Sequence, residues 1–292
     1  MQRRLALIGS QGMLASAVLG CAGEDWEVSA LDLPGFDLTE PGLVRSVLEE
    51  FAPVVIVNCA AYTNVDGAET ETALAMRVNG DGPGHLALVA RRLGAVLVHI
   101  STDYVFDGTQ QRPYREDDPV APISAYGRSK LAGERAILAS GLERYFIMRT
   151  SWLYGPNGRN FVETIVRLAK EREELRIVAD QVGSPTYTAD LAKAIFRLLA
   201  VAGDGRYGIY HYANAGQCSW YEFAVEIVDL LQRRGVPLKV RRVVPISTAE
   251  YPLPAPRPPY SVFSRDKLAA ATGLTIPGWR ESLAEYLALR TD

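Results

Sequence analysis

The fold is decided by the stretch LALIGSQGMLA, residues 5–15. An apolar run at its start reads as a buried strand, and the pattern Gly9-x-x-Gly12-x-x-Ala15 follows directly. In such a turn the first glycine permits a tight bend and the second lets the backbone approach a pyrophosphate. A small third residue then lets the helix pack closely on the strand. The stretch therefore predicts a dinucleotide-binding turn, with a plain strand–helix turn as the alternative.

Short apolar runs alternate with longer helical patterns through the first half of the chain. Several runs are apolar at consecutive positions, which is typical of parallel strands buried on both faces. We therefore predict an α/β fold, a doubly wound and mostly parallel Rossmann sheet with a smaller C-terminal α/β substrate lobe. The predicted strands are Leu5–Ile8, Glu27–Leu31, Val54–Asn58, Val96–Ile100 and Tyr145–Arg149, and the helices fall near 12–21, 41–51, 73–93 and 126–140.

The pattern is less regular after about residue 150. We expect residues 1–150 to form the dinucleotide-binding domain. Residues 151–292 should form mainly the substrate-binding lobe, with some segments returning to the Rossmann sheet. Proline is so frequent in Pro252–Pro259 that we expect an extended surface segment, with a protein-binding polyproline stretch as the alternative. The elements expected here are helices near 161–172, 188–202, 264–272 and 280–290 and a strand at 175–178.

Composition excludes several classes of partner. The 292 residues carry a formal net charge of −3, which does not favour nucleic-acid binding. No apolar run approaches the roughly 18 residues that would suggest a membrane span, and the N-terminal run is too short for a signal peptide. Three cysteines and three histidines are scattered without paired spacing, so we expect no bound metal. These features predict a cytoplasmic protein.

An acidic residue at the end of the second strand bears on the choice of cofactor. Asp32 lies 20 residues after Gly12, where a carboxylate would accept hydrogen bonds from the adenosine ribose and repel a 2′-phosphate. Arg and Lys are absent from residues 28–44, so NADH is favoured over NADPH. The full set of predicted cofactor-binding residues is Gly9, Gln11, Gly12, Met13, Leu14, Asp32, Asp37, Leu38, Ala60, Ala61, Tyr62, Tyr126 and Lys130.

Three residues are the candidates for catalysis. Tyr126 and Lys130 are four apart in a predicted helix and share one face. We expect the ammonium to lower the pKa of the tyrosine and to hold a nicotinamide ribose hydroxyl. Thr102 follows the fourth strand and could hold the substrate oxygen. Ser101 is the rival, but adjacent residues of an extended chain point in opposite directions. The set indicates hydride transfer to or from a carbonyl; an accidental Tyr/Lys face is the alternative.

Longer motifs make the comparison more specific. They are STDYVFDG at 101–108, the Tyr126/Lys130 pair, RTSWLYG at 149–155, DQVGSPTY at 180–187, and Arg257-Pro258 with Ser261. The first three resemble the extended short-chain dehydrogenase/reductase superfamily. Within it, the last two resemble the dTDP-4-dehydrorhamnose reductase family, over nearly the full length.

This resemblance implies the last step of dTDP-L-rhamnose synthesis, in which NAD(P)H reduces the C4 ketone of dTDP-4-dehydro-L-rhamnose. Tyr126 would protonate the developing alkoxide. Lys130 would adjust the pKa of this tyrosine and bind the ribose of the cofactor, and Thr102 would assist the proton transfer. The implied substrate contacts begin with Thr102, Asp103, Tyr104 and Trp152. Gln181 and Thr186 would lie near the nucleotide end of the substrate, and Arg257 would contact the diphosphate. From residue type alone, a core aromatic is the favoured interpretation of Trp152, and a solvated loop cation is the alternative for Arg257.

Two departures from the family pattern bear on cofactor and assembly. Ala15 replaces a third glycine found in some members, a conservative change. Residues 15–18 read Ala-Ser-Ala-Val, without the glutamate that supports a magnesium-bridged dimer in some members. We therefore expect a monomer or a homodimer without such a bridge. One alternative function is another NAD-dependent nucleotide-sugar epimerase, dehydratase or reductase. Dehydratases of this type typically have Asp-Glu after the threonine, so Tyr104 after Asp103 disfavours a dehydratase. The other alternative is a non-catalytic regulatory subunit.

Overall fold

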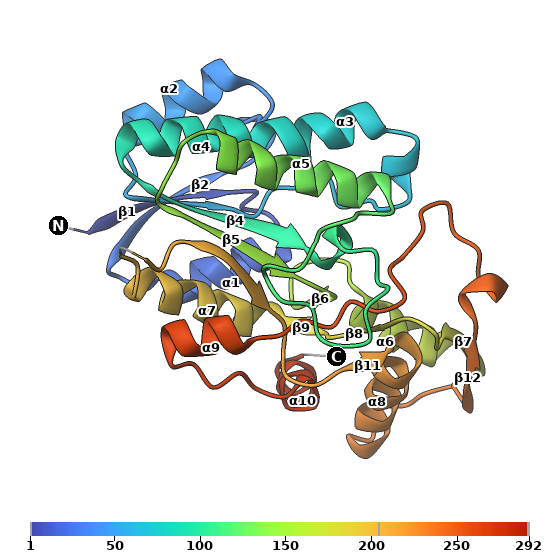
Figure 1. Cartoon of the computed structure of the whole chain (residues 1–292). Coiled ribbons are helices and arrows are strands. Elements are labelled where there is room, and N and C mark those ends of the chain that lie inside the picture. Colours follow the sequence, from blue (N-terminus) through green and yellow to red (C-terminus); the bar gives the residue numbers. More distant parts are fainter. Residues whose placement is uncertain (1, 204, 291–292) are drawn as a thin grey trace.

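The computed structural model describes residues 2–203 and 205–290. Its centre is a six-stranded sheet in the order β10-β5-β4-β3-β1-β2, with every neighbouring pair parallel (Figure 1). This confirms the predicted doubly wound parallel sheet. The sheet strands are β1 (Arg3–Ile8), β2 (Trp26–Leu31), β3 (Val55–Asn58), β4 (Val96–Thr102), β5 (Tyr145–Thr150) and β10 (Gly208–Tyr212).

Helices cover both faces of this sheet and bury the apolar side chains of its central strands on both sides. One face packs on α2, α4 and α5, and the other on α1 and α7 with α9 at the edge (Figure 1). The helices of these two layers are α1 (Met13–Ala22), α2 (Pro41–Phe51), α3 (Thr72–Met76), α4 (Gly82–Leu93), α5 (Ala125–Ala139), α7 (Thr188–Ala200) and α9 (Asp266–Thr272).

A smaller lobe with its own apolar core lies beyond the carboxyl ends of the strands. Its short strand pairs are β6–β9, β7–β12 and β8–β11. The bounds are α6 (Phe161–Glu171), α8 (Trp220–Arg233), α10 (Trp279–Leu289), β6 (Leu153–Tyr154), β7 (Glu174–Val178), β8 (Val182–Gly183), β9 (Thr186–Tyr187), β11 (Cys218–Ser219) and β12 (Arg242–Ile246).

Seven of these elements were not predicted: the short strands β6, β8, β9 and β11, together with β10, α8 and β12. The signal for α8 is present in the sequence, because Ser219 and Glu222 form a reciprocal capping box at its start. β10 is a β-branched and aromatic run that joins β5, so a segment beyond residue 150 completes the central sheet.

The helix predicted near 73–93 is present, but its middle part is a π-helical turn. The structure has α3, then a π-helical turn at Arg77–Asp81, then α4. Pro83 lacks the N–H that would donate to the carbonyl of Asn79 four residues earlier, which favours a departure from regular α-helical hydrogen bonding here. The Asn79 side chain donates to the Tyr62 carbonyl and to Ser129 Oγ, tying the turn to the loop after β3 and to α5.

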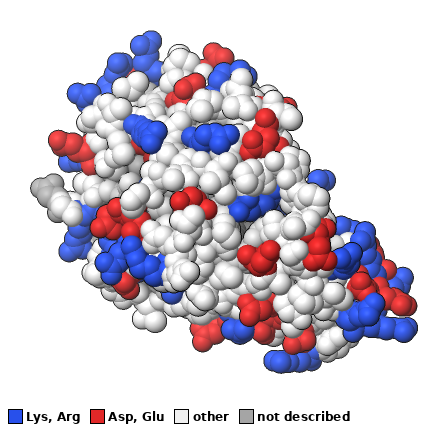
Figure 2. Space-filling view, turned by 45° about the vertical axis from the view of Figure 1, so that its right-hand side comes forward, with Lys and Arg blue, Asp and Glu red and all other residues white. Residues whose placement is uncertain are grey.

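The surface carries charges of both signs. On the face in Figure 2, Lys and Arg side chains are interspersed with Asp and Glu. In the described part of the chain, no helix combines the length and apolar character needed to cross a membrane. Pro252–Pro259 contains neither helix nor strand, as expected, although Ala255 within it is buried.

Candidate active site

A cavity of about 750 Å³ opens where the carboxyl ends of the sheet strands meet the smaller lobe. In open α/β sheets this edge is where ligands bind. Most of the residues predicted for the site line this one cavity. They are Gly9, Gly12, Met13, Leu14, Asp32, Asp37, Leu38, Ala60, Ala61, Thr102, Asp103, Tyr104, Tyr126, Lys130 and Trp152.

The glycine turn brings the backbone close to its neighbours. Gly9 has φ +74°, and a Cβ there would lie 2.6 Å from the backbone nitrogen of Ala60. Helix α1 begins at Met13 with Gly12 as its N-cap and no side-chain cap. The N–H groups of its first turn are therefore available at the cavity, together with the positive end of the helix dipole. This cradle fits the diphosphate of a dinucleotide.

Asp32 is held in place by this loop. One of its carboxylate oxygens accepts from the Gln11 N–H and the other from the Leu33 N–H, both at 2.8 Å. Gln11 itself does not line the cavity, since its side chain donates to the Leu33 carbonyl. The carboxylate is thus oriented at the end of β2, where the sequence predicts the ribose of the cofactor.

Thr102 is the last residue of β4 and lies beside the tyrosine of α5. Its hydroxyl donates to Asp103 Oδ1 at 3.0 Å and accepts from the Tyr104 N–H at 3.3 Å. A side-chain hydrogen bond also links it to Tyr126. Ser101 instead donates to Glu134 at 2.5 Å. The structure therefore pairs Thr102, rather than Ser101, with the tyrosine hydroxyl.

The expectation that Lys130 lowers the pKa of Tyr126 is wrong for this structure. Burial raises the pKa of Tyr126 to about 12, and only the hydrogen bond with Thr102 acts in the opposite direction. The Lys130 ammonium donates to the Ile100 carbonyl at 2.6 Å, and burial lowers its own pKa to about 8. Tyr126 is therefore protonated at neutral pH, the state that a proton donor needs.

Trp152 has a strained backbone and a defined partner. Its φ is +48°, unusual for a residue with a side chain and often a mark of a functional site. Its ring stacks on Trp220 at 3.4 Å between centroids, and both rings line the cavity. Trp220 escaped the sequence analysis because the helix that carries it was not predicted.

Four predicted residues lie outside the lining of the cavity in addition to Gln11. Tyr62 bonds through its hydroxyl to Glu71. The Gln181 side chain donates to Thr248 Oγ1 at 3.0 Å, and Thr186 is fully buried in β9.

The fourth is Arg257, whose guanidinium forms a bidentate ion pair with Asp66, both contacts at 2.8 Å. This pair joins the proline-rich segment to the loop after β3, and the Ala255 N–H donates to the same carboxylate at 3.1 Å. The free loop cation considered from the sequence is therefore wrong: Arg257 has a charged partner and is mostly buried.

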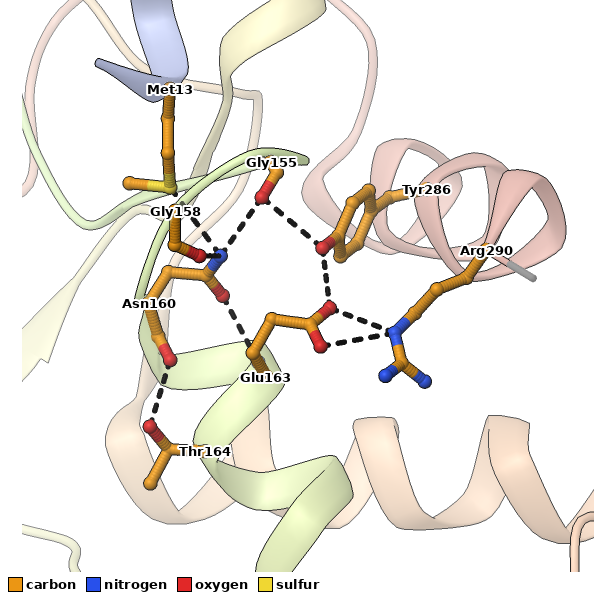
Figure 3. Close-up of polar contacts among 8 residues, drawn as sticks. All are labelled: Met13, Gly155, Gly158, Asn160, Glu163, Thr164, Tyr286 and Arg290. Carbon is orange, nitrogen blue, oxygen red and sulfur yellow. Dashed lines mark hydrogen bonds and ion pairs between the residues drawn. The ribbon is translucent and has the colours of Figure 1, made fainter. Parts of the chain in front are cut away.

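The loop at 155–160 adds a cation that the sequence analysis missed. Arg159 lines the cavity. Its neighbour Asn160 donates to the Gly155 carbonyl at 2.9 Å and approaches the Met13 sulfur at 3.5 Å (Figure 3). No spacing pattern marks an isolated arginine in a loop as a site residue.

A second layer of contacts holds this loop to the end of the chain. Glu163 on α6 accepts from the Tyr286 hydroxyl at 2.5 Å and pairs with Arg290 at 2.8 Å (Figure 3).

Among the described residues, no cluster of His, Cys, Asp and Glu could hold a metal ion.

Comparison with known proteins identifies the family. The model of the RmlD substrate binding domain matches residues 3–291. A dTDP-4-dehydrorhamnose reductase of Burkholderia thailandensis is 46% identical over 252 residues, 84% of each chain. A probable dTDP-4,6-dihydroxy-2-methyloxan-3-one 4-ketoreductase of Streptomyces antibioticus is 43% identical over 97% of this chain and 92% of that protein.

A solved structure agrees along the whole length. The crystal structure of dTDP-4-dehydrorhamnose reductase from Bacillus anthracis in complex with NADP has a TM-score of 0.93 and 42% identity, covering 99% of this chain and 100% of that chain. The chain therefore belongs to the RmlD substrate binding domain family, the dTDP-4-dehydrorhamnose reductase family that its motifs resemble.

Proposed function

We propose that this chain reduces the C4 ketone of dTDP-4-dehydro-L-rhamnose to the alcohol with a reduced nicotinamide dinucleotide. One observation carries the proposal: the dinucleotide cradle and the group Thr102, Tyr126 and Lys130 line the same cavity. Family membership supports the choice of substrate. When bound, the cofactor supplies a hydride to the carbonyl carbon.

The protein supplies the proton and the orientation. Tyr126 gives its phenolic proton to the ketone oxygen as the carbon accepts the hydride, so the product is a neutral alcohol and the tyrosine is left as a phenolate. Lys130 lies one helical turn away on the same face of α5, and we assign it to the nicotinamide ribose. Thr102 has a single hydroxyl proton, which it donates to Asp103 here. To hold the ketone oxygen, it turns that proton toward the substrate.

The walls of the cavity select the sugar. The stacked rings of Trp152 and Trp220 form a flat apolar surface suited to one face of a deoxysugar. Asp103 is buried, and burial raises its pKa to about 6. Asp103 and Tyr104 supply polar contacts. Arg257 can reach a diphosphate only by leaving Asp66, so its predicted role requires an exchange of partners.

The direct test is turnover by the purified chain. We expect dTDP-4-dehydrorhamnose to cause stoichiometric oxidation of NADH or NADPH, followed at 340 nm, with dTDP-rhamnose as the product. An epimerase would consume no net reduced cofactor. A protein that binds cofactor but never oxidises it with this substrate would contradict the proposal, and a regulatory subunit would behave in that way.

We propose further that NADH is preferred. The support is Asp32, held at the predicted ribose position, and the absence of Arg and Lys from residues 28–44. Replacing Asp32 with serine should raise the NADPH/NADH ratio of kcat/KM about tenfold, equivalent to ~1.4 kcal/mol, because a repulsive charge is removed. Asp25→Ser, at the far end of β2, is the control. An unchanged ratio in Asp32→Ser would contradict the assignment.

A further inference from the structure

A buried carboxylate lies directly behind the catalytic group and takes no part in the chemistry described above. Glu134 is on α5, four residues after Lys130, and is 1% exposed. One of its oxygens accepts from Ser101 Oγ at 2.5 Å. The other accepts from Arg149 Nη2 at 2.7 Å, and Arg149 Nε adds a contact of 3.0 Å. Both partners come from strands of the central sheet, β4 and β5.

Arg149 forms a buried ion pair with this carboxylate. Its side chain is 3% exposed, so the two charges face each other with little water between them. Its guanidinium also lies 5.2 Å from the centre of the Phe106 ring and contacts the Glu116 carbonyl and His211. Such a pair persists only when its remaining hydrogen-bonding groups are satisfied, as they are here.

The same face of α5 holds two consecutive residues at the end of β4. Lys130 Nζ donates to the Ile100 carbonyl at 2.6 Å, and Glu134 accepts from the next residue, Ser101. Thr102 follows immediately. The position of its hydroxyl relative to Tyr126 therefore depends on two contacts made one helical turn apart by a single helix.

The titratable groups around Lys130 come from three elements. Glu134 is on its own helix, Cys59 follows β3, and His99 is on β4. Burial disfavours the charged ammonium, and Glu134 is the first group that opposes this effect. His99 is buried and neutral, since its pKa lies well below the usual value. Arg149, on β5, faces Glu134 from the other side.

We propose that Glu134 is a positioning residue of the reductase site: it orders Ser101, and through it Thr102, and it maintains the positive charge of Lys130. The inference rests on the proposed function for its effect on turnover. Its electrostatic part concerns Lys130 itself and is measured without substrate.

The first experiment titrates Lys130 in Glu134→Gln. The chain has five lysines, so ¹³Cε-labelled lysine gives few NMR signals, and Lys130→Arg identifies the one of interest. We expect the midpoint of Lys130 to fall by about one pH unit or more, because an opposite charge is lost. Glu226→Gln removes a carboxylate paired with Arg280 on α8 and α10, and should leave the midpoint unchanged. An unchanged midpoint in folded Glu134→Gln would overturn the electrostatic role.

The second experiment measures kcat/KM against pH. Activity falls as Lys130 loses its proton, so the alkaline limb should move to lower pH in Glu134→Gln. Ser101→Ala removes the hydrogen bond but no charge, and should lower kcat with an unmoved limb. Wild-type kcat in Ser101→Ala would overturn the positioning of Thr102. Absence of turnover in the wild-type protein would defeat the proposed function and leave the lysine titration as a separate result.

A third variant covers the case in which Glu134→Gln does not fold. Glu134→Asp keeps the charge but is one methylene shorter, so it should preserve the Lys130 midpoint and lose the reach to Ser101. We expect a lysine titration like that of the wild type together with a reduced kcat. A displaced midpoint, or a kcat equal to that of the wild type, would count against the proposal.

Discussion

Replacing Tyr126 with phenylalanine should lower kcat by about 10²- to 10⁴-fold, the usual contribution of a positioned proton donor. The substitution removes only the phenolic oxygen, and the ring stays in its edge-on contact with Tyr104, 5.4 Å between centroids. Affinity for the cofactor should fall far less than kcat, since the glycine turn and Lys130 are intact. Pre-steady-state oxidation of NADH with the sugar nucleotide measures the chemical step, and fluorescence titration measures cofactor affinity.

The pH dependence of activity distinguishes the contribution of Tyr126 from that of Lys130. With a pKa of about 12, Tyr126 keeps its proton through the neutral and mildly alkaline range. The pKa of Lys130 is about 8, so a loss of activity above that pH belongs to the lysine. Tyr221→Phe, on α8 outside the cavity, is the matched control. Near-normal kcat in Tyr126→Phe would remove the tyrosine from the mechanism.

Replacing Gly127 with alanine should both destabilise the protein and reduce its activity. A Cβ at this position would lie 2.2 Å from the Tyr104 carbonyl oxygen and 3.0 Å from Pro122. Neither neighbour is the end of a flexible side chain, so the start of α5 must move. Overpacking of this kind costs about 1–3 kcal/mol. The movement also displaces Tyr126, the adjacent residue, from Thr102.

Urea denaturation gives the free energy of unfolding, and kcat gives the effect on the site. Gly20→Ala is the matched control, because Gly20 is in α1 and a Cβ there meets nothing within 4 Å. That variant should gain about 0.5–1 kcal/mol from helix propensity. If Gly127→Ala gained stability as Gly20→Ala does, the close approach of α5 to Tyr104 would not exist in solution.

Local patterns were sufficient for the architecture of the first half of the chain. The predicted parallel sheet and the family are confirmed, because apolar strand runs, the glycine turn and long motifs are properties of contiguous residues. The helical pattern over 73–93 does not reveal the π-helical turn at residues 77–81. The prediction also missed α8, whose capping box was present but not used.

Within the site, sequence patterns could name residues but not their partners. Spacing alone placed Tyr126 and Lys130 on one face of a helix. The stack of Trp152 on Trp220 joins residues 68 positions apart, and the Arg257–Asp66 pair spans 191. Contacts at such separations depend on how the lobe folds back over the sheet, which no local pattern records.

The sequence by itself determined the parallel sheet, the family and the residues to which we assign the chemistry. Only the tertiary structure decided their protonation and hydrogen-bond partners. Burial raises the pKa of Tyr126, Lys130 donates to the Ile100 carbonyl, and Glu134 accepts from Ser101. The physical reason is that pKa values and hydrogen-bond partners depend on burial and on charges from other elements. Those surroundings exist only after β4, β5 and α5 have packed together.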